Sequence, residues 1–364
     1  MIKAQVPGKA TAAGTKRFAD RFADSFESDF YRQTSSRLLV SSIGMGTYLG
    51  ECDDREDGRY VKALAAGIAR GLNVIDTAIN YRCQRSERAA GRALRTMIDN
   101  GTVDRSEIVI CTKAGYVPLE GAPPESRDEY NAYLDREYFS SSVMTRDDLV
   151  AGGHCVRPGF IANQITRSRA NIGVECIDVF YLHNPEQQLD SVSRKDFRSL
   201  MSDAFSELES QVSAGRIASY GCATWNGFRV FGAAKNHLSL EDLVQVAEKV
   251  GGSSHHFRFI QLPINLAMPE AIRAPTQSMS SANAGLLDVA VTLGISVVAS
   301  ASLMQGQLTS SLPDGVRSLF PGLTTDAQRA IAFVRSLPVS TALVGTRSIS
   351  HLEENIAGSA VIRA

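Results

Sequence analysis

The sequence predicts an α/β fold, the (β/α)8 or TIM barrel, in a single domain. Three observations lead to this prediction. Short β-rich runs alternate with longer amphipathic runs, several of the helical runs stop at a glycine, and the rhythm repeats eight times. The repeating part covers about residues 40–357. That length lies inside the range of roughly 200 to over 400 residues that this fold commonly occupies.

The eight expected strands are short runs rich in β-branched and aromatic residues. They cover residues 40–47, 73–78, 108–113, 177–183, 217–224, 257–263, 295–301 and 341–346.

The expected helices follow these strands and show apolar residues at helical spacing. They cover residues 58–70, 86–99, 159–172, 197–214, 240–250, 281–293, 325–336 and 350–357. In the fourth of them the apolar period is close to 3.6 residues, and Gly215 is placed to end the helix. An open doubly wound sheet is the rival fold. It would carry a GxGxxG turn after its first strand, and GMGTYLGE at residues 44–51 lacks that spacing.

Two segments do not fit the alternation of strands and helices. Residues 1–35 are polar with scattered aromatics and are expected to form an N-terminal arm to a barrel of residues 36–364. Residues 117–157 form a long insert between the third strand and its helix. An insert after a strand lies on the catalytic face of such a barrel. Its tyrosines slightly favour a substrate lid over a flexible decoration, and both interpretations stay open.

Composition favours a cytoplasmic protein that acts on a small molecule. The chain has 38 basic and 39 acidic residues, a balance that offers no electrostatic reason to expect nucleic acid or an anionic membrane as partner. No apolar run approaches a membrane span, and the N-terminus lacks the hydrophobic core of a secretory signal. The six cysteines form no CxxC pair and the six histidines are scattered, so we expect reduced thiols and no metal site. The oligomeric state is left open.

Four ionisable groups stand at or just after the ends of consecutive expected strands. Asp76 and Tyr81 follow the second, Lys113 ends the third and His183 ends the fourth. Each alone has an ordinary explanation: a turn or cap for Asp, packing for Tyr, an exposed amine for Lys and a simple hydrogen bond for His. Active sites of these barrels are built at the carboxyl ends of strands, so the set as a whole points to chemistry.

The expected chemistry is delivery of a proton to a carbonyl oxygen. A tyrosine titrates near pH 10 in water, and a nearby Lys⁺ lowers that pKa. Asp76 would hold Lys113 in place and charged, Tyr81 would be the general acid, and His183 would position the carbonyl. No side chain can donate hydride, so a nicotinamide cofactor is implied.

These motifs resemble the aldo-keto reductase family, in a divergent bacterial-type branch. The match rests on GLNVIDTAINY with Asp76 and Tyr81, ICTKAG with Lys113, and IDVFYLHNPE with His183. It extends over about residues 35–360. The resemblance implies a (β/α)8 barrel, NADPH as hydride donor, and reduction of an aldehyde or ketone, with a sugar-type substrate and a reversible reaction both open.

The resemblance also implies cofactor contacts. Gln261 in QLPINL corresponds to the glutamine that meets the nicotinamide carboxamide, and LVGTRSISHLEENI at 343–356 resembles the family's phosphate and adenine motif. This motif places Thr346 and Arg347 near the 2′-phosphate, and Glu354 and Asn355 near adenine. An arginine fork suits a phosphate.

The sequence departs from the family pattern at two cofactor positions. Ala223-Thr224 stands where many members have Ser-Asn, and Ser300 stands where many have a tyrosine stacked on the nicotinamide. Thr224 and Ser300 are still the expected contacts there. Tyr48 and Trp225 are the expected substrate-pocket residues, and a core role for Trp225 is an equal alternative.

Two other functions fit parts of the pattern. A reductase-like barrel could bind the nucleotide as a sensor or regulatory subunit, but such a protein has no need of the proton donor. A Schiff-base aldolase using Lys113 also fits a barrel. It leaves the C-terminal GTRSISHLEEN without a role.

Overall fold

Eight parallel strands close into a barrel, as the sequence predicts. The structure is a computed structural model that describes residues 4–279, 282–345 and 347–360. The barrel strands follow one another in chain order, and the last pairs with the first to close the ring. They are β3 (Ile43–Gly46), β4 (Val74–Asp76), β5 (Val109–Ala114), β6 (Ile177–His183), β7 (Ile217–Ala223), β8 (Phe257–Pro263), β11 (Ser296–Ser300) and β12 (Thr341–Gly345).

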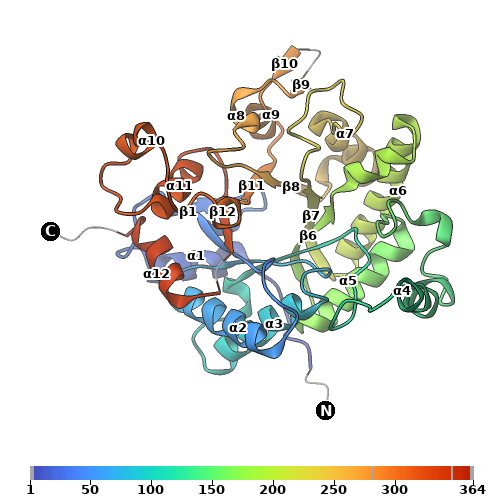
Figure 1. Ribbon diagram of the computed structural model, residues 1–364, viewed down its shortest axis with the longest axis horizontal. Coiled ribbons are helices and arrows are strands. Elements are labelled where there is room, and N and C mark those ends of the chain that lie inside the picture. The colour runs from blue at the N-terminus through green and yellow to red at the C-terminus, as the bar shows by residue number, and fades with distance from the viewer. Residues whose placement is uncertain (1–3, 280–281, 346, 361–364) are drawn as a thin grey trace.

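Helices surround the strands (Figure 1). The main ones are α2 (Asp54–Ala69), α3 (Arg85–Asp99), α5 (Pro158–Ile172), α6 (Arg194–Ser213), α7 (Leu240–Gly251), α9 (Leu286–Thr292), α11 (Asp326–Arg335) and α12 (Ile349–Ala357). Shorter ones are α8 (Glu270–Arg273) and α10 (Asp314–Leu319). Because the strands are covered by helices outside and packed side chains inside, most of their residues are apolar and buried.

One helix is shorter than expected. The sequence predicts a helix over 281–293, but α9 begins at Leu286, and residue 281 lies outside the described residues. Ala282–Ala284 (β10) instead pair antiparallel with Gln277–Met279 (β9). Residues 279–285 carry no apolar face that a helix could bury, and Gly285 begins the helix in extended backbone.

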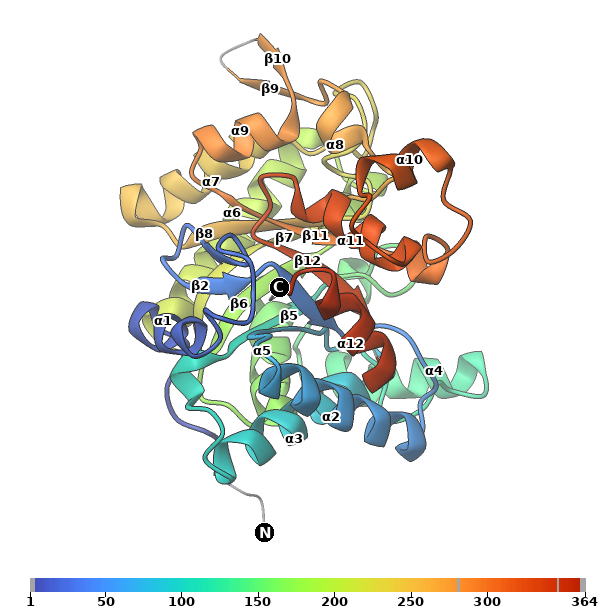
Figure 2. The same ribbon diagram turned by 90° about the vertical axis from the view of Figure 1, so that its left-hand side faces the viewer.

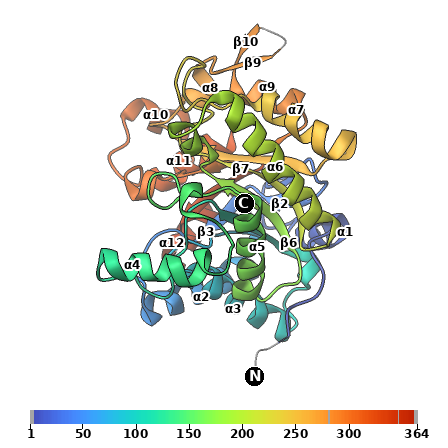
Figure 3. The ribbon, with the colours of Figure 1, turned by 90° about the vertical axis from the view of Figure 1, so that its right-hand side faces the viewer.

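The N-terminal arm packs against the amino-terminal end of the barrel. It contains α1 (Ala12–Arg21) and β1 (Tyr31–Gln33), and β1 pairs with β2 (Leu39–Ser41). Leu38 and Val40 join inward-facing residues of the barrel strands in one apolar cluster. Figures 2 and 3 show α1 at one end of the barrel, while α4 (Arg127–Leu134) and α10 lie toward the other.

The long insert is folded. Besides α4 it contains a π-helical turn over Asp135–Phe139 and a short 3-10 turn over Arg146–Asp148. Its apolar side chains form a cluster of their own against Phe160 at the start of α5. The members are Val117, Tyr133, Leu134, Tyr138, Met144, Cys155 and Phe160.

Candidate active site

A buried ion pair joins the ends of β4 and β5. Asp76 is the last residue of β4, and its Oδ1 lies 2.5 Å from the ammonium nitrogen of Lys113 on β5. Lys113 also donates to the carbonyl oxygen of Thr77 at 2.8 Å, and Gln261 on β8 donates to Asp76 Oδ2 at 2.8 Å. Burial lowers the pKa of Lys113, but Asp76 and Tyr81 outweigh burial, and the pKa is raised. The amine therefore stays charged.

Tyr81 lies over this pair, in the loop that follows β4. The Lys113 ammonium nitrogen is 4.8 Å from the centre of its ring. The pKa of Tyr81 is raised, because burial outweighs the lowering effect of Lys113. The sequence analysis predicts that Lys113 lowers the pKa of Tyr81, and this contribution is confirmed. The net shift is nevertheless upward, so the predicted direction is wrong. A raised pKa keeps the hydroxyl protonated at neutral pH, as a proton donor must be.

His183, the last residue of β6, packs against Tyr81 at the wall of the cavity. The two rings pack edge to face with centres 5.8 Å apart. Burial lowers the pKa of His183 well below its usual value, and the charge of Lys113 acts in the same direction. Its Nδ1 is buried without a hydrogen-bond partner among the described residues. The imidazole is therefore neutral, with the ring free to present one N–H to a ligand.

These groups border one cavity of about 810 Å³ at the carboxyl ends of the strands. It runs from Asp76, Tyr81 and His183 to the residues around the start of α12. Seven predicted pocket residues line it besides the catalytic candidates: Tyr48, Thr224, Trp225, Gln261, Ser300, Glu354 and Asn355. Lys113 lies beneath the lining and acts on it through Asp76 and Tyr81.

The predicted 2′-phosphate contacts are less well placed. Thr346 lies outside the described residues. Arg347 is not part of the cavity lining and forms an ion pair with the buried Glu56 of α2, at 2.7 Å. The sequence did not indicate this pairing, because the two residues are far apart in the chain. Arg347 would have to exchange Glu56 for a phosphate or bridge both.

The cavity fits a nicotinamide cofactor in its remaining features. Thr224 Oγ1 and Asn80 Oδ1 are buried and have no hydrogen-bond partner among the described residues, so both can bind a ligand. Gln261 also lines the cavity and places its amide beside Asp76. Glu354 and Asn355 lie at the other end, in α12. Thr224 and Ser300 stand where the sequence departs from the family pattern, and both line the cavity.

Sequence reasoning missed a set of residues that support His183. Tyr116 also lines the cavity, and its ring packs against His183 with centres 5.1 Å apart. Asn184 and Gln187 donate to its hydroxyl at 2.7 and 2.6 Å. From the insert, His154 bonds the carbonyl oxygen of His183 at 2.7 Å. Tyr116 could have been noticed as a strand-end aromatic three residues after Lys113, but nothing in the sequence indicates the contact of His154.

The insert itself contributes no residue to the cavity lining, and all of residues 117–157 are described. Its contact with the site is indirect, through His154. The lid remains a prediction that would require movement of the insert.

Two kinds of feature are absent from the described part of the chain. No three His, Cys, Asp or Glu side chains are grouped so that they could hold a metal ion. No described helix has the length and apolarity to cross a membrane.

Solved structures of the same fold are numerous. An aldo/keto reductase from Klebsiella pneumoniae, in complex with NADP and acetate, has a TM-score of 0.59 at 20% identity and matches 90% of this chain and 89% of its own. A glycerol dehydrogenase from Gluconobacter oxydans has a TM-score of 0.60 at 19% identity, over 92% of this chain and 89% of its own. At these identities the likeness establishes the fold.

A curated relative is similar in sequence over a shorter stretch. D-threo-aldose 1-dehydrogenase from a Pseudomonas species is 30% identical over 158 residues, which are 43% of this chain. The chain thus spans 41% of the length of the relative it matches.

The family itself is shown by a broader match. The model of the Aldo/keto reductase family matches residues 42–315. This range includes the four catalytic candidates and the glutamine of β8, which are Asp76, Tyr81, Lys113, His183 and Gln261. The resemblance noted in the sequence is thereby confirmed, and the chain belongs to the aldo/keto reductase family, whose members are NAD(P)H-dependent oxidoreductases.

Proposed function

We propose that the protein is an NADPH-dependent carbonyl reductase in which Tyr81 is the general acid. The observation that carries this proposal is the meeting of Tyr81, His183 and the Asp76–Lys113 pair at one cavity. The cofactor supplies hydride to the carbonyl carbon when it is bound. The chain supplies the proton and orients the carbonyl group of the substrate.

His183 positions the substrate. Because it is neutral, it can donate one hydrogen bond to the carbonyl oxygen without a competing positive charge in the cavity. That bond brings the oxygen toward the Tyr81 hydroxyl, since the two rings are in contact.

Tyr81 transfers its proton to the oxygen as negative charge develops there. The phenolate left behind is stabilised by the Lys113 ammonium, which lies over the Tyr81 ring. Asp76 keeps Lys113 charged and in place. Gln261, Thr224 and Ser300 would hold the nicotinamide, and Glu354, Asn355 and Arg347 the adenosine end, with Thr346 in the same segment. Tyr48 and Trp225 would contact the substrate.

We further propose a sugar-type substrate and a reversible reaction in the cytoplasm. The Pseudomonas relative is named for oxidation of an aldose, and the cavity offers hydrogen-bonding groups such as Asn80, Tyr116 and Asn184 around the reacting centre. All six cysteines are free thiols, which suits a reducing compartment.

The test is NADPH oxidation with a panel of aldehydes, ketones and aldoses, and NADP⁺ reduction with the corresponding alcohols and aldoses. Tyr81→Phe is expected to lower kcat by about 10²–10⁴-fold while leaving NADPH binding, followed by its fluorescence, almost unchanged. Tyr130→Phe removes a hydroxyl in the insert that donates to the Gly152 carbonyl oxygen, away from the cavity lining, and serves as the matched control. Equal kcat in wild type and Tyr81→Phe would reject the assigned proton donor. Tight NADPH binding by a wild type that reduces nothing would instead support a nucleotide sensor.

A further inference from the structure

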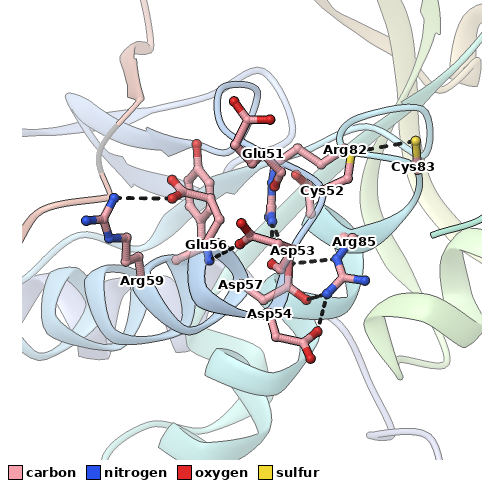
Figure 4. Close-up of polar contacts among 12 residues, drawn as sticks. Glu51, Cys52, Asp53, Asp54, Glu56, Asp57, Arg59, Arg82, Cys83 and Arg85 are labelled. Atoms are coloured by element: carbon pink, nitrogen blue, oxygen red, sulfur yellow. Dashed lines mark hydrogen bonds and ion pairs between the residues drawn. The ribbon is translucent and has the colours of Figure 1, made fainter. Parts of the chain in front are cut away.

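Two cysteines from different loops lie sulfur to sulfur beside the candidate active site. Cys52 follows β3 and Cys83 follows β4, and their sulfur atoms are 3.7 Å apart (Figure 4). Cys52 is partly exposed, whereas Cys83 is 6% exposed. The other four cysteines are buried. A small oxidant in solution would therefore meet Cys52 first, and the group next to it is a second thiol.

The two sulfur atoms are in van der Waals contact. A disulfide has an S–S length of about 2.05 Å, so the two atoms must approach by about 1.7 Å. Such an approach needs side-chain rotation and a small shift of one loop. Both cysteines lie outside regular strands and helices, where such a shift does not break the barrel.

The loop that carries Cys83 has an unusual backbone. Arg82, Cys83 and Gln84 have φ values of 49°, 53° and 70°, three consecutive non-glycine residues in the left-handed region. Side chains disfavour this conformation, so other bonds must hold it. Arg82 does so by donating to the Glu51 carbonyl oxygen at 2.8 Å and to Asp57 at 2.6 Å. Both loops are thus already tied to each other next to the sulfur atoms (Figure 4).

The same loops carry two aromatic residues of the cavity. Tyr81 is two residues before Cys83, and Tyr48 is four residues before Cys52. Their rings are in contact, with centres 5.0 Å apart. A bond between the sulfur atoms would pull the loops together and change the position of Tyr81 relative to Lys113 and His183.

We propose that Cys52 and Cys83 are a redox site: peroxide converts them to a reversible disulfide, and this bond slows catalysis by displacing Tyr81. The disulfide follows from the cysteine geometry alone. The effect on catalysis rests on the function proposed for Tyr81.

The chemistry balances with hydrogen peroxide as oxidant. The Cys52 sulfur, as thiolate, attacks one peroxide oxygen; the O–O bond breaks, a sulfenic acid forms, and the departing hydroxide takes up a proton to give water. The Cys83 sulfur then attacks the Cys52 sulfur, and the S–O bond breaks. The second hydroxide takes the Cys83 proton and leaves as water. Two thiols and one peroxide thus give one disulfide and two waters.

The two cysteines have different roles in this sequence. Burial raises the pKa of Cys83 to about 12, and the neighbouring Cys52 acts in the same direction. Cys83 therefore remains a thiol until the sulfenic acid forms beside it, and acts as the resolving cysteine. A reductant such as dithiothreitol reverses the reaction.

The test compares wild type, Cys52→Ser and Cys83→Ser, with Cys176→Ser as matched control. Cys176 is buried immediately before β6, away from the cavity lining. After stoichiometric peroxide, wild type and Cys176→Ser are expected to lose two thiols per chain and to yield a linked peptide containing Cys52 and Cys83. Their kcat should fall at least fivefold and recover with dithiothreitol. Neither Cys52→Ser nor Cys83→Ser should form the link or show the reversible loss.

A readout without turnover separates this proposal from the proposed function. Amide hydrogen exchange of residues 78–86 should change on oxidation in wild type and Cys176→Ser only. If the protein reduces no carbonyl but forms the Cys52–Cys83 link and shows this exchange change, the redox site is supported and the proposed reaction is rejected. Over-oxidised Cys52 without a link would overturn the redox site. A link with unaltered exchange and kcat would overturn its effect on Tyr81.

Discussion

Individual charges at the site are set by burial as much as by their partners. Lys113 is 1% exposed and remains charged because Asp76, with a smaller contribution from Tyr81, compensates for the loss of water. For Tyr81, burial outweighs the lowering effect of Lys113 on the pKa, and for His183 burial and the charge of Lys113 both lower the pKa, so both side chains stay neutral. The site therefore holds one cation, one carboxylate and two neutral groups that can donate a proton or a hydrogen bond.

Replacing Asp76 with Asn tests that balance. The amide can still accept from Gln261, but it no longer offsets the burial of the Lys113 cation, so the lysine pKa falls. We expect the basic limb of the pH profile of kcat to move to lower pH, and the protein to lose about 3–5 kcal/mol of unfolding free energy. Glu87→Gln is the control, because Glu87 is equally buried but bonds Thr112 and Asn171 outside the cavity. An Asp76→Asn profile that coincides with wild type would contradict the role of the pair.

His154 gives a prediction about pH and stability. Its Nε2 bonds the His183 carbonyl and its Nδ1 meets the Gln188 amide, so the neutral ring fits both partners. Burial lowers its pKa to about 4. The unfolded chain, with a pKa near 6.5, then binds this proton first, and stability is lost as the pH falls from about 6.5 to about 4. The group contributes up to about 3 kcal/mol to that loss.

The measurement is the free energy of unfolding across this pH range for wild type and His154→Gln. The variant is expected to show a flatter slope, whereas His351→Gln, at an exposed position of α12, should keep the wild-type slope. His183 contributes in the same direction in all three proteins. Identical slopes for wild type and His154→Gln would show that the histidine is not buried in neutral form.

At the scale of elements, the loops after the strands carry the cavity, and buried polar groups fix them. Glu186, after β6, accepts the backbone N–H groups of Trp225, Asn226 and Gly227 with one oxygen, at 3.1, 3.2 and 3.3 Å. It thereby holds the loop after β7, which places Trp225 at the cavity. The positions of these loops depend on such bonds because loops have few apolar contacts of their own.

Glu186→Ala is expected to raise KM for the substrate about tenfold and change kcat little. Without the carboxylate, the loop after β7 loses its hydrogen-bond acceptor and no longer holds Trp225 at the cavity. Tyr81 and His183 keep their positions. Glu186→Gln retains one oxygen acceptor and should restore most of the affinity. A fall in kcat without a change in KM would assign Glu186 to the chemistry and not to the loop.

The elements also show what a sequence can predict. Strand ends were found because apolar runs mark strands and polar residues mark where they stop, so Asp76, Lys113 and His183 were predicted to lie close together. Contacts made by long loops were not. The return of His154 from the insert to His183, the pairing of Arg347 with Glu56 and the meeting of Cys52 with Cys83 join segments 29 or more residues apart. Such contacts carry no local pattern.

At the scale of the whole molecule, the two ends of the barrel have different roles. The cavity and its loops occupy the carboxyl end. The N-terminal arm packs at the other end, where Figure 2 shows α1. Asp178 ties the arm to the barrel by accepting the Ala10 N–H at 2.6 Å and bonding Arg105 at 2.8 Å. Arg21 of α1 pairs with Glu107 through two bonds of 2.6 and 2.9 Å. These contacts stabilise the fold and touch no residue of the cavity.

A core substitution in the arm should therefore separate stability from activity. Phe18 of α1 is fully buried and packs against Phe22 and Tyr31, so Phe18→Ala is expected to cost about 3–5 kcal/mol of unfolding free energy. Its kcat per folded molecule, measured well below the lowered Tm, should stay near wild type. Tyr81→Phe should show the reverse, a normal Tm with lost turnover, because Tyr81 lines the cavity and its ring is retained. If Phe18→Ala also lost turnover while folded, the arm would be coupled to the active site through the barrel, and the division between the two ends would be wrong.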